Sequence, residues 1–220
     1  MPTPWRLRLL CGCALIAVVT CINDADPFVG VSHEVRKGSG SVTSDVKFVT
    51  IHVPQGTIRI RLLPELSRSS VDYVVNVAQQ NKCASSRECK FYRAEPTFLL
   101  QGNMKTQLPP NRQLGPCPAE FAGKPRATAC PAHDPNCGCH GPIMVPGQVG
   151  WAGGGSGPDF FIYTGQGPAT HWNNDHTVWG ELADQESLSV VEAVLQLPTD
   201  RPPHGMLMLK HTIPFTIQLE

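Results

Sequence analysis

Alternation of apolar and polar residues begins at residue 46 and recurs to the end of the chain. Residues 46–53 (VKFVTIHV) and 57–63 (TIRIRLL) alternate on either side of Pro54-Gln55-Gly56, which predicts a β-hairpin. Further short apolar segments are candidate strands, at residues 90–92, 98–101, 149–152, 160–163, 177–181 and 213–219.

Two other segments have the three- and four-residue spacing of amphipathic helices. After Pro64, the apolar positions Val71, Val74 and Ala78 share one face, and residues 187–197 repeat the pattern. Helices of this kind cover the apolar face of a sheet or close the end of a barrel. We therefore expect a mainly β fold, a closed eight-stranded antiparallel β-barrel capped by two α-helices.

The N-terminus has a different pattern. Arg6 and Arg8 precede a nearly unbroken apolar run at residues 9–22. A run of about 14 residues is shorter than the roughly 20 that span a bilayer and is typical of a signal peptide. A short uncleaved signal anchor and an organelle transit sequence are the alternatives.

Residues after this segment contain Gly, Ser, Asp and Lys with little periodicity, which predicts a linker. The expected organisation is a targeting segment at 1–22, a linker at 23–45 and a folded domain at 46–220, with a Cys- and Pro-rich insertion at 104–146. We expect the protein in the secretory pathway, in the ER or Golgi lumen or secreted. Residues 7–22 could attach it to the membrane.

Composition narrows the choice of partners. Lys+Arg and Asp+Glu each number 18, so the formal net charge is zero and no basic surplus is available to neutralise a phosphate backbone. The sequence therefore predicts no nucleic-acid partner. The chain holds 21 Pro and 20 Gly, which indicates many turns between short elements, and we expect a monomer.

Six cysteines follow the targeting segment, and an even number is typical of disulfides formed in an oxidising compartment. The candidates are Cys83, Cys89, Cys117, Cys130, Cys137 and Cys139. Only five residues separate Cys83 from Cys89, so this pair is the expected local bridge. We expect the other four to staple the insertion, with no metal bound. The alternative is a zinc site of Cys130, Cys137 and Cys139 with His133 or His140.

Four ordered blocks resemble the cyclophilin family. FYRAEPTFLLQGN at residues 91–103 is similar to the family signature, with Arg93 at the place of its catalytic arginine. The other blocks are GWAGGGSGPDFFIYT at 150–164, HTVWGE at 176–181 and SVVEA at 189–193, and together the resemblance covers about 46–219. With its N-terminal segment and Cys-rich insertion, the chain resembles plant and algal members of the secretory pathway.

This resemblance implies a peptidyl-prolyl cis/trans isomerase that acts on X-Pro bonds of luminal or secreted proteins and assists their folding, without a cofactor. Arg93 and Gln101 would be catalytic. The implied substrate-binding residues are Phe98, Leu99, Gly150, Trp151, Phe161, His171, Trp172 and His176. Side chains of this set would form an apolar slot for the proline ring, while backbone groups near Gly150 and Trp151 would hold the substrate chain.

The chain also departs from the family pattern. His171, with Trp172 one place later, stands where the family commonly has a tryptophan at the pocket rim. Glu95 replaces an apolar residue, and Asp159 introduces a carboxylate that would weaken the action of Arg93 if the two groups paired. Two other functions therefore stay open: a proline-peptide binding or scaffolding module with little turnover, and a structural luminal protein that binds partners through its Cys-rich loop.

Overall fold

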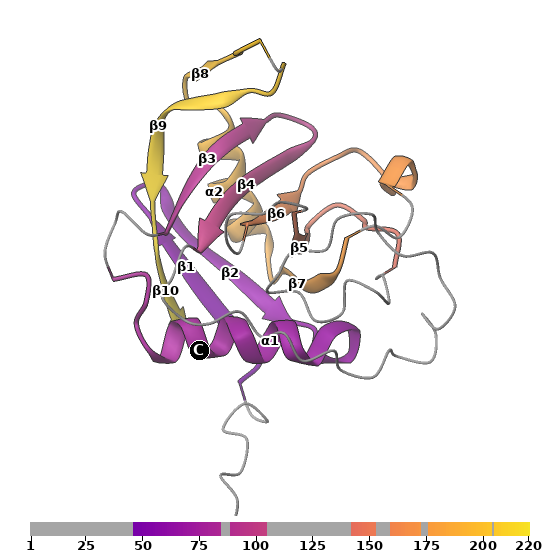
Figure 1. The fold of residues 1–220 in the computed structure, drawn as a ribbon, viewed down its shortest axis with the longest axis vertical. Helices are drawn as coiled ribbons and strands as arrows, with labels where there is room; N and C mark the ends of the chain where they lie inside the picture. Colours follow the sequence, from indigo (N-terminus) through magenta and orange to yellow (C-terminus); the bar gives the residue numbers. More distant parts are fainter. Residues whose placement is uncertain (1–45, 85–88, 105–141, 153–158, 173–175, 204) are drawn as a thin grey trace, which may run out of the picture. The chain divides into compact units, whose positions relative to one another are not determined.

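Ten strands of the computed structural model form one antiparallel sheet, in the order β10-β1-β2-β7-β5-β6-β4-β3-β9-β8 (Figure 1). The structure describes residues 46–84, 89–104, 142–152, 159–172, 176–203 and 205–220. The strands are β1 Phe48–Val53, β2 Gly56–Leu62, β3 Cys89–Glu95, β4 Leu99–Met104, β5 Gln148–Trp151, β6 Asp159–Tyr163, β7 Val178–Leu182, β8 Thr199–Asp200, β9 Met208–Pro214 and β10 Thr216–Leu219. The prediction of a mainly β, antiparallel fold with two helices is confirmed.

The strand count differs from the predicted eight at the C-terminal end of the chain. The predicted strand at 213–219 is two strands, because the chain bends at Phe215 between β9 and β10. β9 pairs with β3, whereas β10 pairs with β1 at the other end of the strand order. The two-residue strand β8, which pairs with β9, was not predicted. One bent C-terminal segment therefore reaches both sides of the curled sheet.

The hydrophobic core forms because alternate strand residues point to the same face. Val49, Ile51, Ile58 and Ile60 of the β1–β2 hairpin are all fully buried, as the alternation predicts. Aromatic rings fill much of the core: Trp151 of β5 and Trp179 of the neighbouring strand β7 lie 5.3 Å apart between ring centroids. The core therefore depends on large rings supplied by late parts of the sequence.

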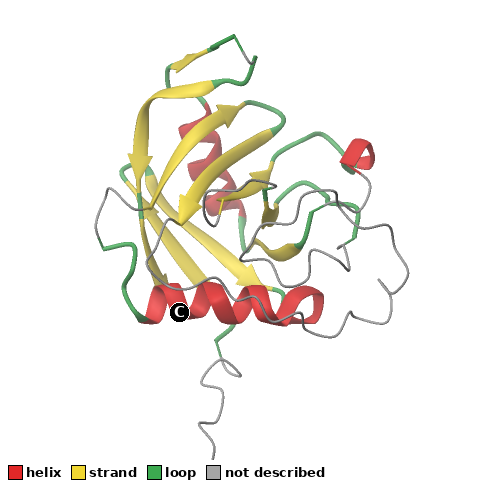
Figure 2. Cartoon of the chain, in the orientation of Figure 1, coloured by secondary structure: helices red, strands yellow, loops and turns green. Residues whose placement is uncertain are grey.

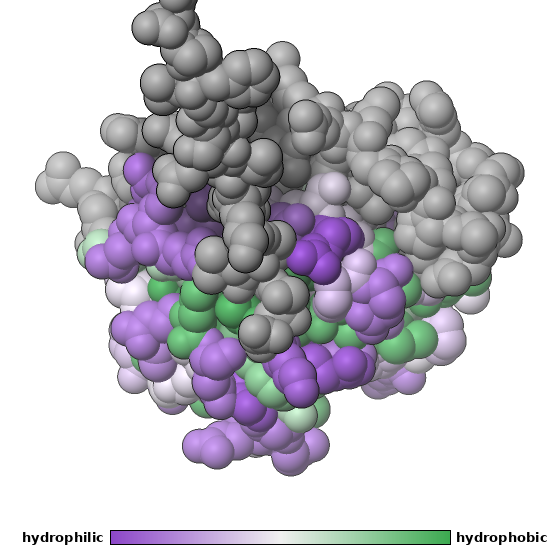
Figure 3. All heavy atoms as spheres, turned by 90° about the horizontal axis from the view of Figure 1, so that it is seen from below, coloured by the Kyte–Doolittle hydropathy of each residue, from purple (hydrophilic) through white to green (hydrophobic). Residues whose placement is uncertain are grey.

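Helix α1, Pro64–Gln79, lies across one end of the sheet and buries the apolar face that its spacing predicts (Figure 2). Proline suits the first turn because that turn leaves backbone N–H groups unpaired. Ser70 ties the helix to the core, since its Oγ accepts a hydrogen bond from Nε1 of Trp151 at 2.9 Å. Seen from below the view of Figure 1, the surface mixes polar and apolar residues (Figure 3). On α1, Arg68 and Asp72 form an ion pair one helical turn apart.

Helix α2, Gln185–Leu195, packs mainly against β2. Asp184 begins it as an N-cap, since its carboxylate accepts a hydrogen bond from the backbone N–H of Ser187 at 2.8 Å. Hydrogen bonds from the side chain and the backbone of Ser187 favour the charged carboxylate, so the pKa of Asp184 lies below its usual value. The cap fixes where the chain leaves β7 and enters the helix.

A disulfide joins Cys83 to Cys89, with 5.3 Å between the two Cα atoms, which confirms the expected local bridge. It links the segment after α1 to the first residue of β3. The other four candidate cysteines, the targeting segment, the linker and almost all of the insertion lie outside the described residues. None of the described helices is long and apolar enough to cross a membrane.

Gly102 of β4 offers a test of the packing that places the site. A Cβ there would lie 2.8 Å from Cδ1 of Phe91, 3.0 Å from the carbonyl oxygen of Lys90 and 3.2 Å from Cε1 of Phe160. Gly102→Ala should therefore lower the free energy of unfolding by about 1 to 3 kcal/mol, as overpacked cores do. The measurement is urea unfolding, with Gly167→Ala as the matched control because nothing lies within 4 Å of its Cβ position. Equal stability of the two variants would contradict this account of the packing.

Candidate functional site

Three neighbouring strands place the candidate catalytic residues in one row. Arg93 of β3 pairs with Gln101 of β4, and Gln101 pairs with Phe161 of β6. Side chains of directly paired residues lie on the same face of an antiparallel sheet. The interleaved residues Ala94 and Leu100 are fully buried in the core. The register therefore brings a guanidinium, an amide and an aromatic ring together on the face opposite the core.

A cavity of about 210 Å³ lies at this row. The residues that line it are Arg93, Phe98, Leu99, Gln101, Ala152, Phe161, Trp172 and His176. Most of these side chains are apolar or aromatic, and Arg93 is the only Lys or Arg among them. The cavity is thus a small apolar slot with one cationic group in its wall.

The guanidinium of Arg93 is held on two sides. Its Nη1 donates a hydrogen bond to Oε1 of Gln101 at 3.0 Å, and its Nε donates to Oε1 of Glu95 at 2.7 Å. Nη2 lies 2.6 Å from the same Glu95 oxygen. The guanidinium carbon is 5.8 Å from the centre of the Phe98 ring. Arg93 therefore approaches the cavity with its orientation fixed by two neighbours.

Trp172 is the centre of an aromatic cluster at the cavity. Its ring centroid lies 5.2 Å from that of Phe98, 5.3 Å from that of Phe161 and 4.9 Å from that of His176. His171, beside it in the short 3₁₀ helix Thr170–Trp172, is exposed and stacks on Phe98 with 6.0 Å between ring centroids. Trp172 lines the cavity, whereas His171 lies outside the lining.

His176 is oriented by the backbone of β5. Its Nδ1 lies 2.9 Å from the carbonyl oxygen of Trp151, so the proton on this nitrogen is donated to that oxygen. The imidazole meets the Phe161 ring edge to face, with 4.9 Å between centroids. This contact completes an aromatic wall facing Arg93.

Of the ten predicted catalytic and substrate-binding residues, three lie outside the cavity lining. Gly150 and Trp151 are buried in β5, where Gly150 pairs with Phe161 and Trp151 with Phe160. Gly150 lies deep in the sheet, and Trp151 faces the core because its side chain follows the opposite phase of the alternation. His171 is the third. Ala152, which was not predicted, lines the cavity; the available signal was its place two positions after Gly150 in the predicted strand at 149–152, because residues two apart in a strand share a face.

The carboxylate that pairs with Arg93 is Glu95 rather than Asp159. Asp159 accepts a hydrogen bond from Nδ2 of Asn103 at 2.5 Å and a further hydrogen bond from the hydroxyl of Tyr92. Burial raises the pKa of Asp159, and the hydrogen bonds from Asn103 and Tyr92 only partly oppose this. The sequence suggested that Asp159 could weaken the action of Arg93 by pairing with it, but the carboxylate that pairs with Arg93 is that of Glu95.

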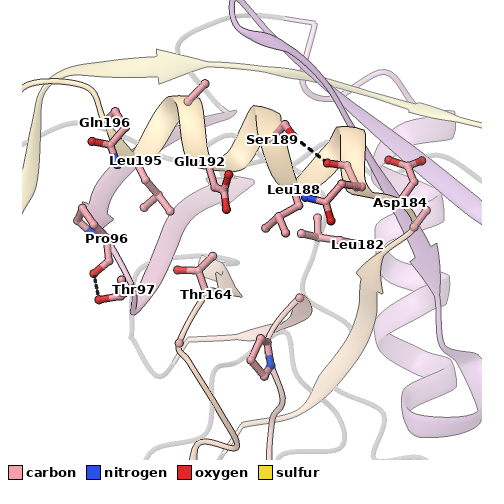
Figure 4. Close-up of a pocket in the computed structure, with 16 residues that line it drawn as sticks. Pro96, Thr97, Thr164, Leu182, Asp184, Leu188, Ser189, Glu192, Leu195 and Gln196 are labelled. Atoms are coloured by element: carbon pink, nitrogen blue, oxygen red, sulfur yellow. Dashed lines mark hydrogen bonds between the residues drawn. The ribbon is translucent and has the colours of Figure 1, made fainter.

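A second, larger hollow lies on the other side of the turn between β3 and β4. It has a volume of about 800 Å³ and runs between α2 and this turn (Figure 4). Pro96 and Thr97 of the turn line it, and no Lys, Arg or His does. No group of three or more His, Cys, Asp and Glu that could hold a metal ion occurs in the described part of the chain. The cavity at Arg93 is therefore the candidate active site.

Comparison with known sequences gives the family. A model of the family described as "Cyclophilin type peptidyl-prolyl cis-trans isomerase/CLD" matches residues 48–213. Peptidyl-prolyl cis-trans isomerase A of Mycobacterium tuberculosis is 27% identical over 163 residues, which covers 69% of this chain and 81% of that protein. Probable peptidyl-prolyl cis-trans isomerase A of Mycobacterium leprae is 25% identical over 163 residues, with the same coverage.

Comparison with solved structures supports the fold. A cyclophilin-type peptidyl-prolyl cis-trans isomerase of Cryptosporidium parvum, crystallised in the presence of the dipeptide Ala-Pro, has a TM-score of 0.51 and 15% sequence identity. The match covers 79% of this chain and 98% of the other. At this identity the likeness concerns the fold alone.

The burial of Asp159 predicts a pH-dependent stability. Its pKa is raised in the folded state, so the folded protein binds this proton more tightly, and stability falls as pH rises from about 4 through the raised pKa. Asp159→Asn keeps an oxygen acceptor for Asn103 and Tyr92 but cannot ionise, so the variant does not lose stability as pH rises. We expect a higher free energy of unfolding than wild type at pH 7 and no difference at pH 3, by urea titration.

Asp72→Asn is the control for this experiment, because Asp72 lies on the surface of α1 in an ion pair with Arg68. It should bring no gain at pH 7. If Asp159→Asn were less stable than wild type at pH 7, the charged form would be favoured by its partners and the assigned direction would be wrong.

Proposed function

The chain belongs to the cyclophilin-type peptidyl-prolyl cis-trans isomerase family, and we propose that its cavity at Arg93 accelerates rotation about peptide bonds that precede proline. The observation that carries the proposal is a guanidinium, fixed by two side chains, in the wall of an apolar slot. The reaction of the family implies that a proline residue binds in the slot. The geometry makes the guanidinium the hydrogen-bond donor to it.

Rotation about an X-Pro bond is slow because it destroys amide resonance, at a barrier of about 18 to 20 kcal/mol. As the bond twists, the prolyl nitrogen becomes pyramidal and gains a lone pair. A donor directed at that lone pair binds the twisted state more tightly than either planar state and so lowers the barrier. No covalent bond is broken, so the reaction requires positioning and hydrogen bonding rather than a nucleophile.

Arg93 has donors left for this task. A guanidinium carries five N–H groups, and Gln101 and Glu95 engage one N–H on each of its three nitrogens. One N–H therefore remains on each terminal nitrogen. One charge-assisted hydrogen bond contributes roughly 1.5 to 3 kcal/mol, which corresponds to about ten- to a hundredfold in rate. The aromatic wall would supply the rest of the rate enhancement by holding the proline ring in place.

We propose proline-containing polypeptides as the substrates, and the dipeptide used with the Cryptosporidium relative supports this choice. We also propose that the clients are luminal or secreted proteins whose folding the enzyme assists, that the enzyme acts as a monomer in the secretory pathway, and that residues 7–22 direct or attach it there. Support comes from the apolar N-terminal run and from the Cys83–Cys89 disulfide, a bond typical of oxidising compartments.

The alternative of a proline-peptide binding module with little turnover rests on the pairing of Arg93 with Glu95, which occupies two of its nitrogens. A module of this kind would bind a proline peptide without accelerating its isomerisation. Measuring binding and exchange in one NMR titration separates the two functions.

Replacement of Arg93 tests the proposed role. Arg93→Ala should lower kcat/KM for a proline tetrapeptide by about ten- to a hundredfold, because the donor to the prolyl nitrogen is lost. Arg93→Lys should also lose most activity, since an ammonium lacks the planar fork that reaches Gln101, Glu95 and substrate together. The assay is cis/trans exchange measured by NMR.

The control for the loss of an arginine is Arg61→Ala, because Arg61 forms a surface ion pair with Glu181 away from the cavity. Its activity should equal that of wild type. Full activity in both Arg93 variants, with folding confirmed by circular dichroism, would remove Arg93 from the mechanism and with it the proposed site.

A further inference from the structure

Glu95 is close to the catalytic machinery but outside the cavity lining. It is two residues after Arg93 in β3, and residues two apart in a strand point to the same face. β4 places Leu99 directly opposite Glu95 and Gln101 directly opposite Arg93. The strand register therefore makes Glu95 and Gln101 the two neighbours that can reach the guanidinium from the same face.

The Arg93–Glu95 pair is also the most sheltered ion pair among the described residues. Its side chains are 16% and 19% exposed, whereas the next pair, Arg59–Glu220, is 34% and 45% exposed. Exposed pairs contribute little because water screens them and both side chains lose freedom on pairing. Water therefore screens this contact less than it screens the surface pairs.

We propose that Glu95 is a positioning residue for catalysis: its carboxylate fixes the plane and rotation of the Arg93 guanidinium so that the two remaining N–H groups point into the cavity. This inference rests on the proposed function of Arg93. With Gln101 alone, one hydrogen bond at Nη1 would leave the guanidinium free to swing about that contact. The contacts to Nε and Nη2 fix the opposite edge of the same plane.

The competing effect is that a carboxylate reduces the positive field of the guanidinium. Bond rotation transfers no net charge, so the enzyme stabilises a lone pair and a dipole rather than an ion. A directional hydrogen bond decays steeply when the angle is wrong, whereas the field of a paired cation falls only in part. Orientation is therefore the larger effect, and the loss of Glu95 should reduce turnover.

The experiment compares Glu95→Ala with Glu95→Gln in full-length protein. Glu95→Ala should lower kcat about tenfold with KM within twofold of wild type, since the proline slot is intact but the donor is no longer held. Glu95→Gln keeps an oxygen acceptor for Nε and should retain at least a third of wild-type kcat. The Nε–Hε signal of Arg93 should exchange faster with solvent in the alanine variant only.

Glu181→Ala and Glu181→Gln are the matched controls, because Glu181 pairs with Arg61 on the surface. Both should leave kcat and the Arg93 signal unchanged. If Glu95→Ala and Glu95→Gln both raised kcat, the field effect would dominate and the positioning role would be wrong. If Arg93→Ala lost activity while Glu95→Ala kept it, only the role of Glu95 would fail. Full activity in Arg93→Ala would instead refute the proposed function itself.

The larger hollow between α2 and the β3–β4 turn is a groove, and it supports a second inference from different observations. Apolar side chains of Leu182, Leu188 and Leu195 lie along it (Figure 4). Its charged lining residues are both acidic, Asp184 and Glu192, and no cation lines it. A volume of about 800 Å³ is within the range of binding sites, at roughly 300 to 1,000 Å³.

The two carboxylates differ in what they can bind. Asp184 is committed to capping α2 through the backbone of Ser187, and Arg59 is close enough to help keep its pKa low. Glu192 is exposed and extends over the groove, and its side chain has no hydrogen bond or ion pair with another described residue (Figure 4). An incoming cation would therefore pair with Glu192.

The geometry points to an extended polypeptide segment, with Lys or Arg between apolar residues, as the occupant of this groove. Apolar side chains would meet the leucines, and the cation would meet Glu192 by charge complementarity. The groove also adjoins the active site, since Pro96 and Thr97 line the groove while Phe98 and Leu99 line the cavity. A polypeptide held at Arg93 could thus continue across the turn into the groove.

A proline-free nonapeptide of alternating Leu and Lys tests this site, because without proline it has no ligand for the slot at Arg93. Titrated into the ¹⁵N-labelled full chain, it should shift amide signals of residues 182–196 saturably. Glu192→Lys should weaken its binding at least fivefold. Glu186→Lys is the control, since Glu186 is an exposed acidic residue of α2 outside the groove lining.

A peptide with Glu in place of Lys should cause no saturable shift. Equal binding of the two peptides, or equal effects of the two lysine substitutions, would refute the charge complementarity. Absence of saturable shifts up to millimolar peptide would refute the site, including the case in which another segment of this chain already covers it.

Discussion

The proposed active site depends on the pairing register of β3, β4 and β6. That register places Arg93 opposite Gln101 and Gln101 opposite Phe161 on one face, while Ala94 and Leu100 are buried on the other. A shift of one residue would exchange the two faces, moving a cation into the core and apolar residues to the cavity. Burial of the core face therefore enforces the arrangement of the face that carries Arg93, Gln101 and Phe161.

The turn between β3 and β4 connects the parts of the site. Thr97 adopts a positive φ of 60°, which a non-glycine residue adopts only when its surroundings require it. The backbone N–H of Phe98 donates to the carbonyl oxygen of Glu95 at 3.0 Å, and the N–H of Thr164 donates to the carbonyl oxygen of Phe98 at 2.9 Å. One turn, fastened to the end of β6, thus places both the partner of Arg93 and the aromatic wall.

Local patterns in the sequence predicted the elements but not which way every residue faces. The alternation in the first hairpin, the helical spacing after Pro64 and the short Cys83–Cys89 separation are local, and each prediction was confirmed. The facing of Trp151 depends on pairing with β6 and β7, and the bend at Phe215 depends on strands at both ends of the sheet. Such non-local pairings leave no periodic signal in the segment that they orient.

The partner of Arg93 was not predicted, although its sequence signal was local and simple. Residues 93 and 95 share a strand face, whereas Asp159 is two positions from Phe161 on a strand that does not adjoin β3. A guanidinium in an apolar slot needs partners for its charge, because desolvation without them is costly. Glu95 and Gln101 supply these partners. The Glu95 carboxylate reduces the net positive charge at the cavity. The same contact allows the Arg93 guanidinium to remain in an apolar cavity in one orientation.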